Sequence, residues 1–425
     1  MTAVAIIGAG YAGLACAVEL ALQEVEVTVF ERSRTMGGRA RAVHKDGWTL
    51  DNGQHLLSGA YTELMRLLRL TGVSPRRLEC LPLTLHIPGQ LHFRAASLPA
   101  PLHLLAGLVR AHGLGWRDSF AIALFLHKIK HTQCRLPEEM TVAHFLEKNK
   151  QTPRLCRLIW EPLCLAALNT PAIEASARIF ANVLRDTLAA NSSASELLIP
   201  RIDLSELFPV PAARTLATRN GNVLTGNPIT GITPDGTGFR LTGAPGQRIW
   251  PHVVIATAPH HAVPLLESTG ACAPLAAQIA ALPNKAIATV YIHFDEGIRL
   301  PAPMMGLTGH PAQWAFDRGQ SGGPVGLMAM VISDSPTQEN GNALAAESLA
   351  QLEQALGRKL PAPLWAQTII EKRATFACRP GVARPDITTP LPGLWLVGDY
   401  IESEYPATLE SAVRSGVRCA REILG

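Results

Sequence analysis

The residues with the clearest chemical meaning are three glycines and an acid close to the N-terminus. Gly8 permits a tight turn, Gly10 lets a pyrophosphate approach the backbone, and Gly13 lets a helix pack closely on a strand. Glu31 lies 18 residues after Gly13, near the spacing of an acid that accepts hydrogen bonds from ribose hydroxyls. A helix that begins at such a turn presents free N–H groups to phosphates. These residues therefore predict a dinucleotide site.

The elements that must position these residues are two strands and a helix. Apolar runs at 4–7 and 27–30 predict buried strands, and the small residues at 14–22 predict a helix between them. Gly38 and Arg39 follow the second strand and favour FAD over NAD as the cofactor. We predict that FAD is bound noncovalently, in a site that also includes Tyr11, Ala12 and Arg32.

The order of these features resembles the N-terminal pattern of the amine oxidase and carotenoid desaturase superfamily of flavoproteins. The resemblance implies that Arg39 reaches the pyrophosphate of FAD. It extends to the C-terminal segment, where Asp399 would bond the ribitol chain. A last helix, beginning near Thr408 and Leu409, would aim its N–H groups at a carbonyl of the flavin. The other contacts that the resemblance implies involve Gly398 beside Asp399, Gly53 and Gln54 near the isoalloxazine, and Ile229 against the adenine.

The domain organisation follows from the need to bring both ends of the chain to one cofactor. We predict an α/β fold with a discontinuous, Rossmann-like FAD-binding domain, formed by segments 1–73, 212–259 and 376–425. An α+β substrate domain would be formed by segments 74–211 and 260–375. Within it, residues 98–190 are predicted to be mainly helical.

Composition excludes several classes of protein. The 425 residues are 47% hydrophobic with a mean hydropathy of +0.15, which suits a large core and an apolar pocket. A net charge of +4, with no basic run among aromatics, gives no indication of nucleic-acid binding. No Cys or His spacing predicts a metal site. We expect no signal peptide before the first strand, no spanning helix, and a reducing, cytoplasmic location.

Three side chains are candidates for moving a proton during catalysis. His55 titrates near neutral pH in its ordinary state. Glu161 lies in an apolar helical run, where a carboxyl tends to have a raised pKa that suits a general acid. Tyr405 lies between Asp399 and the last helix. Each also has a structural interpretation, because His55 can bond the backbone, Glu161 can pair with Arg157, and Tyr405 can shape its loop.

Several longer stretches narrow the resemblance; they are 51–55, 155–171, 180–186, 207–209 and 405–412. These stretches are similar to the hydroxysqualene dehydroxylase family, FAD-dependent enzymes of bacterial hopanoid biosynthesis, and the similarity extends over essentially the whole chain. It implies that the chain reduces hydroxysqualene, an allylic C30 alcohol, to squalene. The sequence does not indicate whether NAD(P)H or a small redox protein is the electron donor.

One segment indicates contact with a membrane surface. Residues 98–130 are rich in Leu and Ala and carry Arg110, Arg117, Lys128 and Lys130 against a single acid. Apolar helical faces flanked by cations suit the interface of an anionic membrane, although ordinary core helices with solvated cations have the same composition. Given the implied C30 substrate, we predict a peripheral protein on the inner face of the bacterial cytoplasmic membrane.

Three other functions stay open from the sequence. A carotenoid-type desaturase or isomerase, acting on phytoene or dehydrosqualene, would use the same fold and an apolar tunnel. An amine oxidase would need an aromatic cage, for which Tyr400 and Tyr405 are candidates, and Lys285 would be its flavin-facing lysine. No cysteine near Tyr405 is placed to tether a flavin. The third alternative is a flavin-bound lipid carrier without catalysis.

Overall fold

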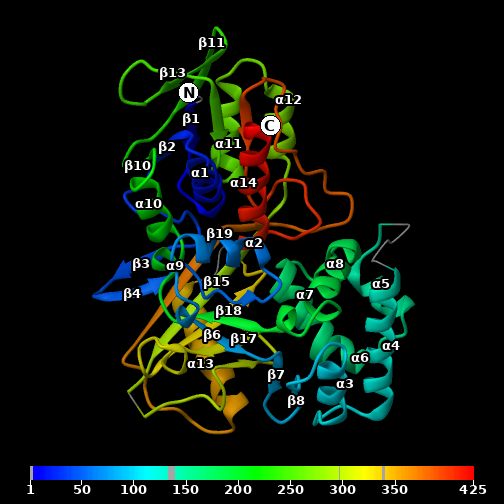
Figure 1. The fold of residues 1–425 in the computed structure, drawn as a ribbon. Helices are drawn as coiled ribbons and strands as arrows, with labels where there is room; N and C mark the ends of the chain where they lie inside the picture. Colours follow the sequence, from blue (N-terminus) through cyan, green and yellow to red (C-terminus); the bar gives the residue numbers. More distant parts are fainter. Residues whose placement is uncertain (1–2, 133–138, 296, 337–339) are drawn as a thin grey trace.

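The computed structural model describes residues 3–132, 139–295, 297–336 and 340–425. Its upper part in Figure 1 contains a parallel sheet with the strand order β10-β2-β1-β14-β20. These strands are β1 (Ala3–Ile7), β2 (Glu26–Glu31), β10 (Gly221–Thr225), β14 (His252–Ile255) and β20 (Leu394–Leu396). The sheet therefore joins strands from the beginning, the middle and the end of the chain, and the predicted Rossmann-like α/β fold is confirmed.

The helix that follows β1 packs against the last helix of the chain. Helix α1 (Tyr11–Leu22) contacts α14 (Leu409–Leu424) and α10 (Pro209–Ala217). A Cβ atom at Gly416 would lie 2.2 Å from the Ala12 carbonyl oxygen, so the glycine allows the close approach of α14 to α1. The remaining elements of this part are the antiparallel strands β11 (Gly231–Asp235), β12 (Gly238–Thr242) and β13 (Ile249–Trp250), with α11 (Pro259–Glu267) and α12 (Ala273–Ala280).

A second large sheet is antiparallel and has one covered face. Its order is β16-β17-β18-β15-β19, and its strands are β15 (Asn284–His293), β16 (Met304–Gly306), β17 (Trp314–Asp317), β18 (Leu327–Ser333) and β19 (Trp365–Phe376). Ala288, Val290 and Ile292 are buried with α13 (Gly341–Leu356). Because side chains alternate along a strand, Ile287 and Thr289 point to the opposite face. That face is turned toward the functional site.

The lower right of Figure 1 is a group of helices from residues 102–188. They are α3 (Leu102–Val109), α4 (Trp116–Thr132), α5 (Val142–Lys148), α6 (Pro153–Leu155), the π-helical turn η2 (Cys156–Trp160), α7 (Glu161–Leu168) and α8 (Ala177–Leu188). Phe125 forms their centre, with ring centroids 5.2 Å from Trp160 and 5.4 Å from Phe145. In the described part of the chain, no helix is both long and apolar enough to cross a membrane.

Short elements connect these parts. They are the hairpin β3 (Ala42–Lys45) and β4 (Trp48–Asp51), the sheet of β5 (Leu57–Ser58), β9 (Leu197–Pro200) and β6 (Leu78–Leu81), the hairpin β7 (Thr84–Ile87) and β8 (Leu91–Arg94), the helices α2 (Thr62–Leu70) and α9 (Leu204–Leu207), and the 3-10 turns η1 (Pro75–Arg77), η3 (Ser193–Ser195) and η4 (Gly319–Ser321). Many of their side chains line the cavity described next.

Candidate active site

A cavity of about 1170 Å³ is lined by residues of both large sheets. One part is polar and is formed by the β1–α1 turn, the end of β2 and the first residues of α11. The other part is apolar and is lined by Leu56, Leu57, Leu83, Leu85, Leu163, Leu165, Ala166, Leu197, Ile287, Met304, Trp314, Phe316, Val331 and Ile369. The cavity thus combines a surface suited to a polar group with an apolar arm.

Nearly all the residues predicted to hold the cofactor line this cavity. They are Gly8, Gly10, Tyr11, Ala12, Glu31, Arg32, Gly38, Arg39, Gly53, Gln54, Ile229, Gly398, Asp399, Thr408 and Leu409. Gly13 lies beneath the turn instead, where a Cβ atom would be 2.1 Å from the Gly8 carbonyl oxygen. That contact fits the packing role predicted for Gly13. Segments that are far apart in the sequence therefore meet around one space.

The β1–α1 turn has the form of an anion site. Gly8 has φ +113°, a conformation that favours glycine. Helix α1 begins directly after Gly10 and has no side-chain cap and no acid in its first turn, so its N-terminal N–H groups stay available. A Cβ atom at Gly10 would meet no atom nearer than 4.0 Å, the Cα of Gly38, so there is room above the turn for a phosphate.

The acid at the end of β2 is fixed by two backbone groups. The Glu31 carboxylate accepts hydrogen bonds from Ala9 N at 2.8 Å and from Ser33 N at 2.7 Å. Both bonds hold the carboxylate beside the turn, where its free lone pairs can accept from the hydroxyls of a ribose. Thr257 also lines the cavity, and its buried hydroxyl has no partner. A polar ligand is the natural partner for such a group.

Arg39 and Asp399 join the two ends of the chain across the cavity. Arg39 Nη2 donates to Asp399 Oδ1 at 2.6 Å, although 360 positions separate the two residues. The Asp399 side chain is 11% exposed and that of Arg39 is 32% exposed, so solvent screens the pair only in part. Arg39 also donates to the carbonyl of Ala374 on β19. The guanidinium is therefore positioned by two segments that are distant from Arg39 in the sequence.

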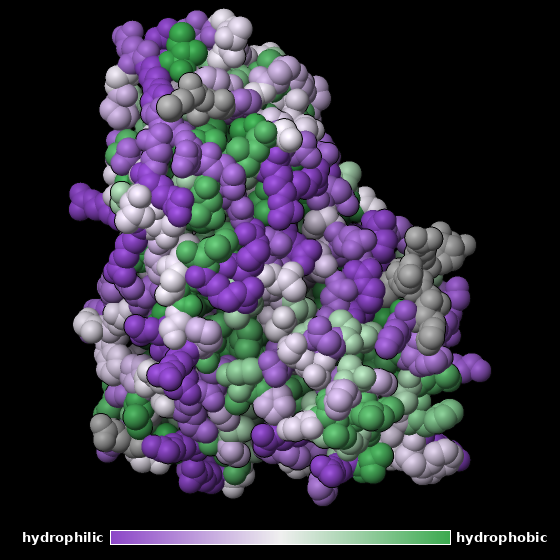
Figure 2. Space-filling model, viewed as in Figure 1, coloured by the Kyte–Doolittle hydropathy of each residue, from purple (hydrophilic) through white to green (hydrophobic). Residues whose placement is uncertain are grey.

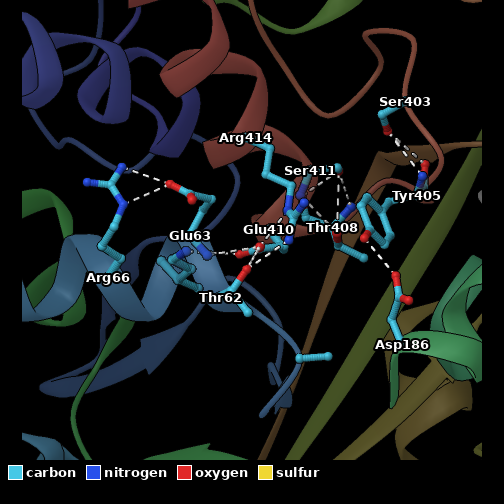
Figure 3. A network of polar contacts seen from close by, with 12 residues as sticks. Thr62, Glu63, Arg66, Asp186, Ser403, Tyr405, Thr408, Glu410, Ser411 and Arg414 are labelled. Atoms are coloured by element: carbon cyan, nitrogen blue, oxygen red, sulfur yellow. Dashed lines mark hydrogen bonds and ion pairs between the residues drawn. The ribbon is translucent and has the colours of Figure 1, made fainter. Parts of the chain in front are cut away.

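The N-terminus of α14 forms another wall of the cavity. Thr408 is the N-cap residue, and its hydroxyl accepts from Ser411 N at 3.2 Å. Ala407, Thr408 and Leu409 line the cavity, whereas Glu410 turns away to α2. The Glu410 carboxylate accepts from Glu63 N at 3.0 Å and Leu64 N at 2.9 Å, as Figure 3 shows for Glu63. One acid thereby holds the starts of α14 and α2 together.

The surroundings of His55 weigh against its predicted role as a proton donor. His55 lines the cavity, and its Nδ1 lies 2.8 Å from the carbonyl oxygen of Gly53. Because a carbonyl oxygen only accepts, Nδ1 carries the proton, and the neutral ring has none on Nε2. Burial, and to a smaller extent the charge of Arg39, lowers the pKa of His55 below its ordinary value. The ring is therefore neutral at physiological pH and disfavoured as an acid.

The two other proton-transfer candidates do not line the cavity. Glu161 is exposed at the first position of α7, so the apolar setting predicted for its carboxyl is wrong. The run around it is apolar, but a helix turns successive residues to different faces, and Glu161 faces solvent. Tyr405 is half-buried and donates its hydroxyl to Asp186 Oδ2 at 2.7 Å (Figure 3). Burial and this carboxylate raise the pKa of Tyr405 to about 12.

Lys285 is also placed outside the cavity lining. Its amine lies 2.8 Å from Asp334 Oδ1 and 3.4 Å from Glu174 Oε2, and its side chain is 13% exposed. Ile287, two positions further along β15, lines the cavity instead. A lysine committed to two carboxylates is not available to act beside a cofactor in the cavity.

Sequence reasoning missed other polar residues of the lining, above all Tyr61. Tyr61 lies six residues after His55, at the N-cap of α2. Residues 52–57, which precede it, line the same cavity, so a polar aromatic at the end of this loop was the available signal. Asn169 was missed as well; its amide donates to Thr375 Oγ1 at 3.0 Å across 206 positions, a pairing that no local pattern indicates.

Comparison with known proteins assigns the chain to a protein family. Residues 11–424 match the family described as flavin containing amine oxidoreductase. The chain belongs to this family, and its cofactor is a flavin. An oxidoreductase from Methanosarcina mazei has a TM-score of 0.76 and 17% identity, and the match covers 99% of this chain and 100% of that one.

Within the family, the chain is similar to proteins named hydroxysqualene dehydroxylase. That of Rhodopseudomonas palustris is 30% identical over 99% of this chain and 97% of the relative. That of Zymomonas mobilis is 28% identical over 99% and 98% of the two chains. A 15-cis-phytoene desaturase of Synechococcus elongatus is 22% identical over 99% of this chain and 95% of its own length.

Proposed function

We propose that the protein is an FAD-dependent hydroxysqualene dehydroxylase, which reduces the allylic alcohol hydroxysqualene to squalene. The observation that carries this proposal is the composition of the cavity, in which the polar dinucleotide part continues into an apolar arm. The similarity to enzymes of that name over 95% or more of both chains supports it. The 22% identical phytoene desaturase gives weaker support to desaturation as an alternative.

The residues of the polar part fit FAD. The open N-terminus of α1 and the space over Gly10 would hold the pyrophosphate, and Glu31 would accept from the ribose. The first residues of α14 would face the flavin ring. We propose noncovalent binding, because none of the described residues that line the cavity is a cysteine.

The chain's own contribution to the reaction is to bind an apolar chain, exclude water and supply a proton. When reduced, a flavin supplies a hydride. Leucines at 56, 57, 163 and 165 and the aromatic rings of Trp314 and Phe316 would enclose the isoprenoid chain. Hydroxide is a poor leaving group, so the substrate oxygen needs a proton as its bond to carbon breaks. Water exclusion protects a developing allylic cation from side reactions.

We also propose that the protein acts at the surface of a membrane, on the inner face of the bacterial cytoplasmic membrane. Seven large apolar side chains are exposed on α3, on α4 and just before α3; they are Leu98, Leu102, Leu105, Val109, Trp116, Phe120 and Leu124, and we name them the α3–α4 face. Figure 2 shows apolar surface gathered over these helices at the lower right. Arg110 and Arg117 flank the α3–α4 face, as expected for contact with anionic lipid.

The β7–β8 hairpin connects the α3–α4 face with the cavity. Leu83 and Leu85 line the apolar arm from the start of this hairpin. Phe93, on its second strand, packs so closely on α3 that a Cβ atom at Gly107 would lie 2.8 Å from its ring. A nearly insoluble C30 alcohol would then pass between the bilayer and the cavity without crossing water.

The test is a single turnover without oxygen. Chemically reduced holoenzyme is mixed with hydroxysqualene, and flavin reoxidation and squalene formation are followed together; equal rates are expected. Oxidised holoenzyme is mixed in parallel with phytoene and with an amine. Desaturation of phytoene at a higher rate, rapid oxidation of the amine, or a flavin that no lipid reoxidises would each reject the proposal. Once the chemistry is established, NAD(P)H and a small redox protein can be compared as reductants of the bound flavin.

A further inference from the structure

Tyr61 is a residue of the cavity lining whose chemistry the description above does not use. It lies between β5 and α2, and its backbone N–H donates to the carbonyl of Ser58 at 3.0 Å. The neighbouring Leu57 lines the apolar arm. On the other side, Thr408, the N-cap of α14, lines the same cavity. The phenol therefore stands where the polar wall meets the apolar arm.

The other tyrosines are occupied or lie elsewhere. The chain has five tyrosines, all in described segments. Tyr11 donates to the carbonyl of Leu204 at 2.9 Å, and Tyr291 donates to the carbonyl of Asp51 at 3.1 Å. Both hydroxyls are committed to the backbone, so neither is free to give its proton to a ligand.

Tyr400 and Tyr405 lie outside the cavity lining. The Tyr405 hydroxyl donates a hydrogen bond to Asp186, and the Tyr400 hydroxyl is buried without a partner. Of the five tyrosines, Tyr11 and Tyr61 line the cavity, and the Tyr11 hydroxyl is bonded to the backbone, which leaves Tyr61.

The position of Tyr61 is fixed by the same acid that joins α14 to α2. Tyr61 is the N-cap of α2, and Glu410 of α14 accepts from the N–H groups of Glu63 and Leu64 in the first turn of α2 (Figure 3). Arg414 Nε donates to the same carboxylate at 2.6 Å. This buried clamp holds the start of α2 against α14. The phenol is therefore presented to the cavity by a rigid junction, which is what precise proton transfer requires.

Resting on the function proposed above, we propose that Tyr61 is the catalytic acid, which donates its phenolic proton to the leaving oxygen of the allylic alcohol. The bond between the allylic carbon and oxygen breaks, and the carbon accepts a hydride, with its electron pair, from the reduced flavin. The oxygen keeps the pair of the broken bond, takes the Tyr61 proton and leaves as water. Solvent returns a proton to the phenolate when the product leaves.

The electrostatics of the two candidates differ in which of them carries a proton to donate at neutral pH. Burial, and then the nearby charge of Glu410, raises the pKa of Tyr61, so the phenol keeps its proton throughout the physiological range. The pKa of His55 is lowered, so its imidazolium is scarce at neutral pH. Hydroxide is more basic than a phenolate even at a raised pKa, so transfer of the proton to the departing oxygen is favourable. With Tyr61 as the acid, the rate should not fall between pH 6 and 9; with His55 it should fall as pH rises.

The first experiment compares single-turnover squalene formation by Tyr61→Phe and its parent, with FAD content and Tm measured for both. The variant should keep its flavin and lose about a hundredfold or more in rate, within the range for a positioned acid. Tyr291→Phe is the matched control, because it removes a buried hydroxyl that does not line the cavity; it should turn over at the parent rate. A Tyr61→Phe variant with the parent rate, or a parent rate that falls steadily above pH 6, would overturn the proposal.

A second experiment changes the leaving group. The acetate ester of hydroxysqualene has acetate as its leaving group, and acetate needs no proton to depart. The difference in rate between Tyr61→Phe and the parent should therefore largely disappear with this substrate. An equal loss with alcohol and ester would show that Tyr61 only shapes the cavity, and would overturn the proposal. If the parent itself fails to form squalene from either substrate, the proposed function is at fault.

A binding measurement without turnover completes the test. Oxidised holoenzyme does not reduce its ligand, and Trp314 in the lining provides a fluorescence signal for occupancy of the apolar arm. The parent should prefer hydroxysqualene over squalene, and Tyr61→Phe should lose roughly threefold to tenfold of this preference, the contribution of one hydrogen bond. An unchanged preference would contradict contact between Tyr61 and the substrate oxygen.

Discussion

The exposed aromatic residues of the α3–α4 face should determine binding to lipid. Trp116 and Phe120 are 76% and 66% exposed, one turn apart on α4. Nothing in a soluble fold favours two such side chains in water, whereas the interface of a bilayer accommodates both. The perturbation is the double substitution Trp116→Ser and Phe120→Ser, which removes apolar surface without adding charge.

The magnitude follows from the exposed area. An aromatic side chain carries roughly 200 Å² of surface, so the two exposed fractions amount to about 280 Å². At about 25 cal/mol per Å², complete withdrawal from water is worth about 7 kcal/mol. A peripheral helix buries only part of this surface, so we take about 3 kcal/mol as the loss. That loss corresponds to roughly a hundredfold weaker partition into liposomes.

The assay is co-sedimentation with liposomes that contain anionic lipid, with Tm measured to confirm folding. Leu364→Ser is the matched control, because Leu364 is 65% exposed and lies outside the α3–α4 face; its partition should equal that of the parent. Exchanging Arg110 and Arg117 for Glu should cost roughly 1 kcal/mol per charge, and this loss should shrink at high salt. An unchanged partition of the double variant would refute the reasoning. Self-association through the α3–α4 face, without lipid binding, would refute it too.

Three further results are expected. Glu31→Arg should bind FAD much more weakly, because it replaces an acceptor by a cation at the turn, whereas acid precipitation of the parent should release its FAD into the supernatant; full FAD content in the variant would contradict this. Burial raises the pKa of the Asp51 carboxyl from 3.8 to about 6, so its charged form costs stability above pH 6 and little below pH 4. Asp51→Asn should therefore raise the free energy of unfolding by up to about 3 kcal/mol at pH 7 and leave it unchanged below pH 4, as denaturant titrations at both pH values can check. Glu161→Gln should keep the parent rate of squalene formation, since its carboxylate is exposed outside the cavity; a slow variant would restore Glu161 as the acid.

Local sequence was sufficient to predict that the glycine turn and the acid Glu31 lie side by side. Gly8, Gly13 and Glu31 act within one strand–helix–strand unit, so their spacing alone specifies which groups meet. The glycines are needed for steric reasons that hold in any such unit. The resemblance to a family then extended the prediction to the C-terminal half of the cavity, where Asp399 and Thr408 line the same space as the N-terminal turn.

Only the tertiary structure decided which proton-bearing groups line the cavity. Sequence identified an acid in an apolar run, but the direction in which a helix turns that acid depends on packing, and Glu161 faces solvent. It identified His55, but not the carbonyl and the burial that keep the ring neutral. It passed over Tyr61, which lines the same cavity as Thr408 although most of the chain separates the two residues. Such contacts depend on how separate segments pack together, and no local pattern encodes them.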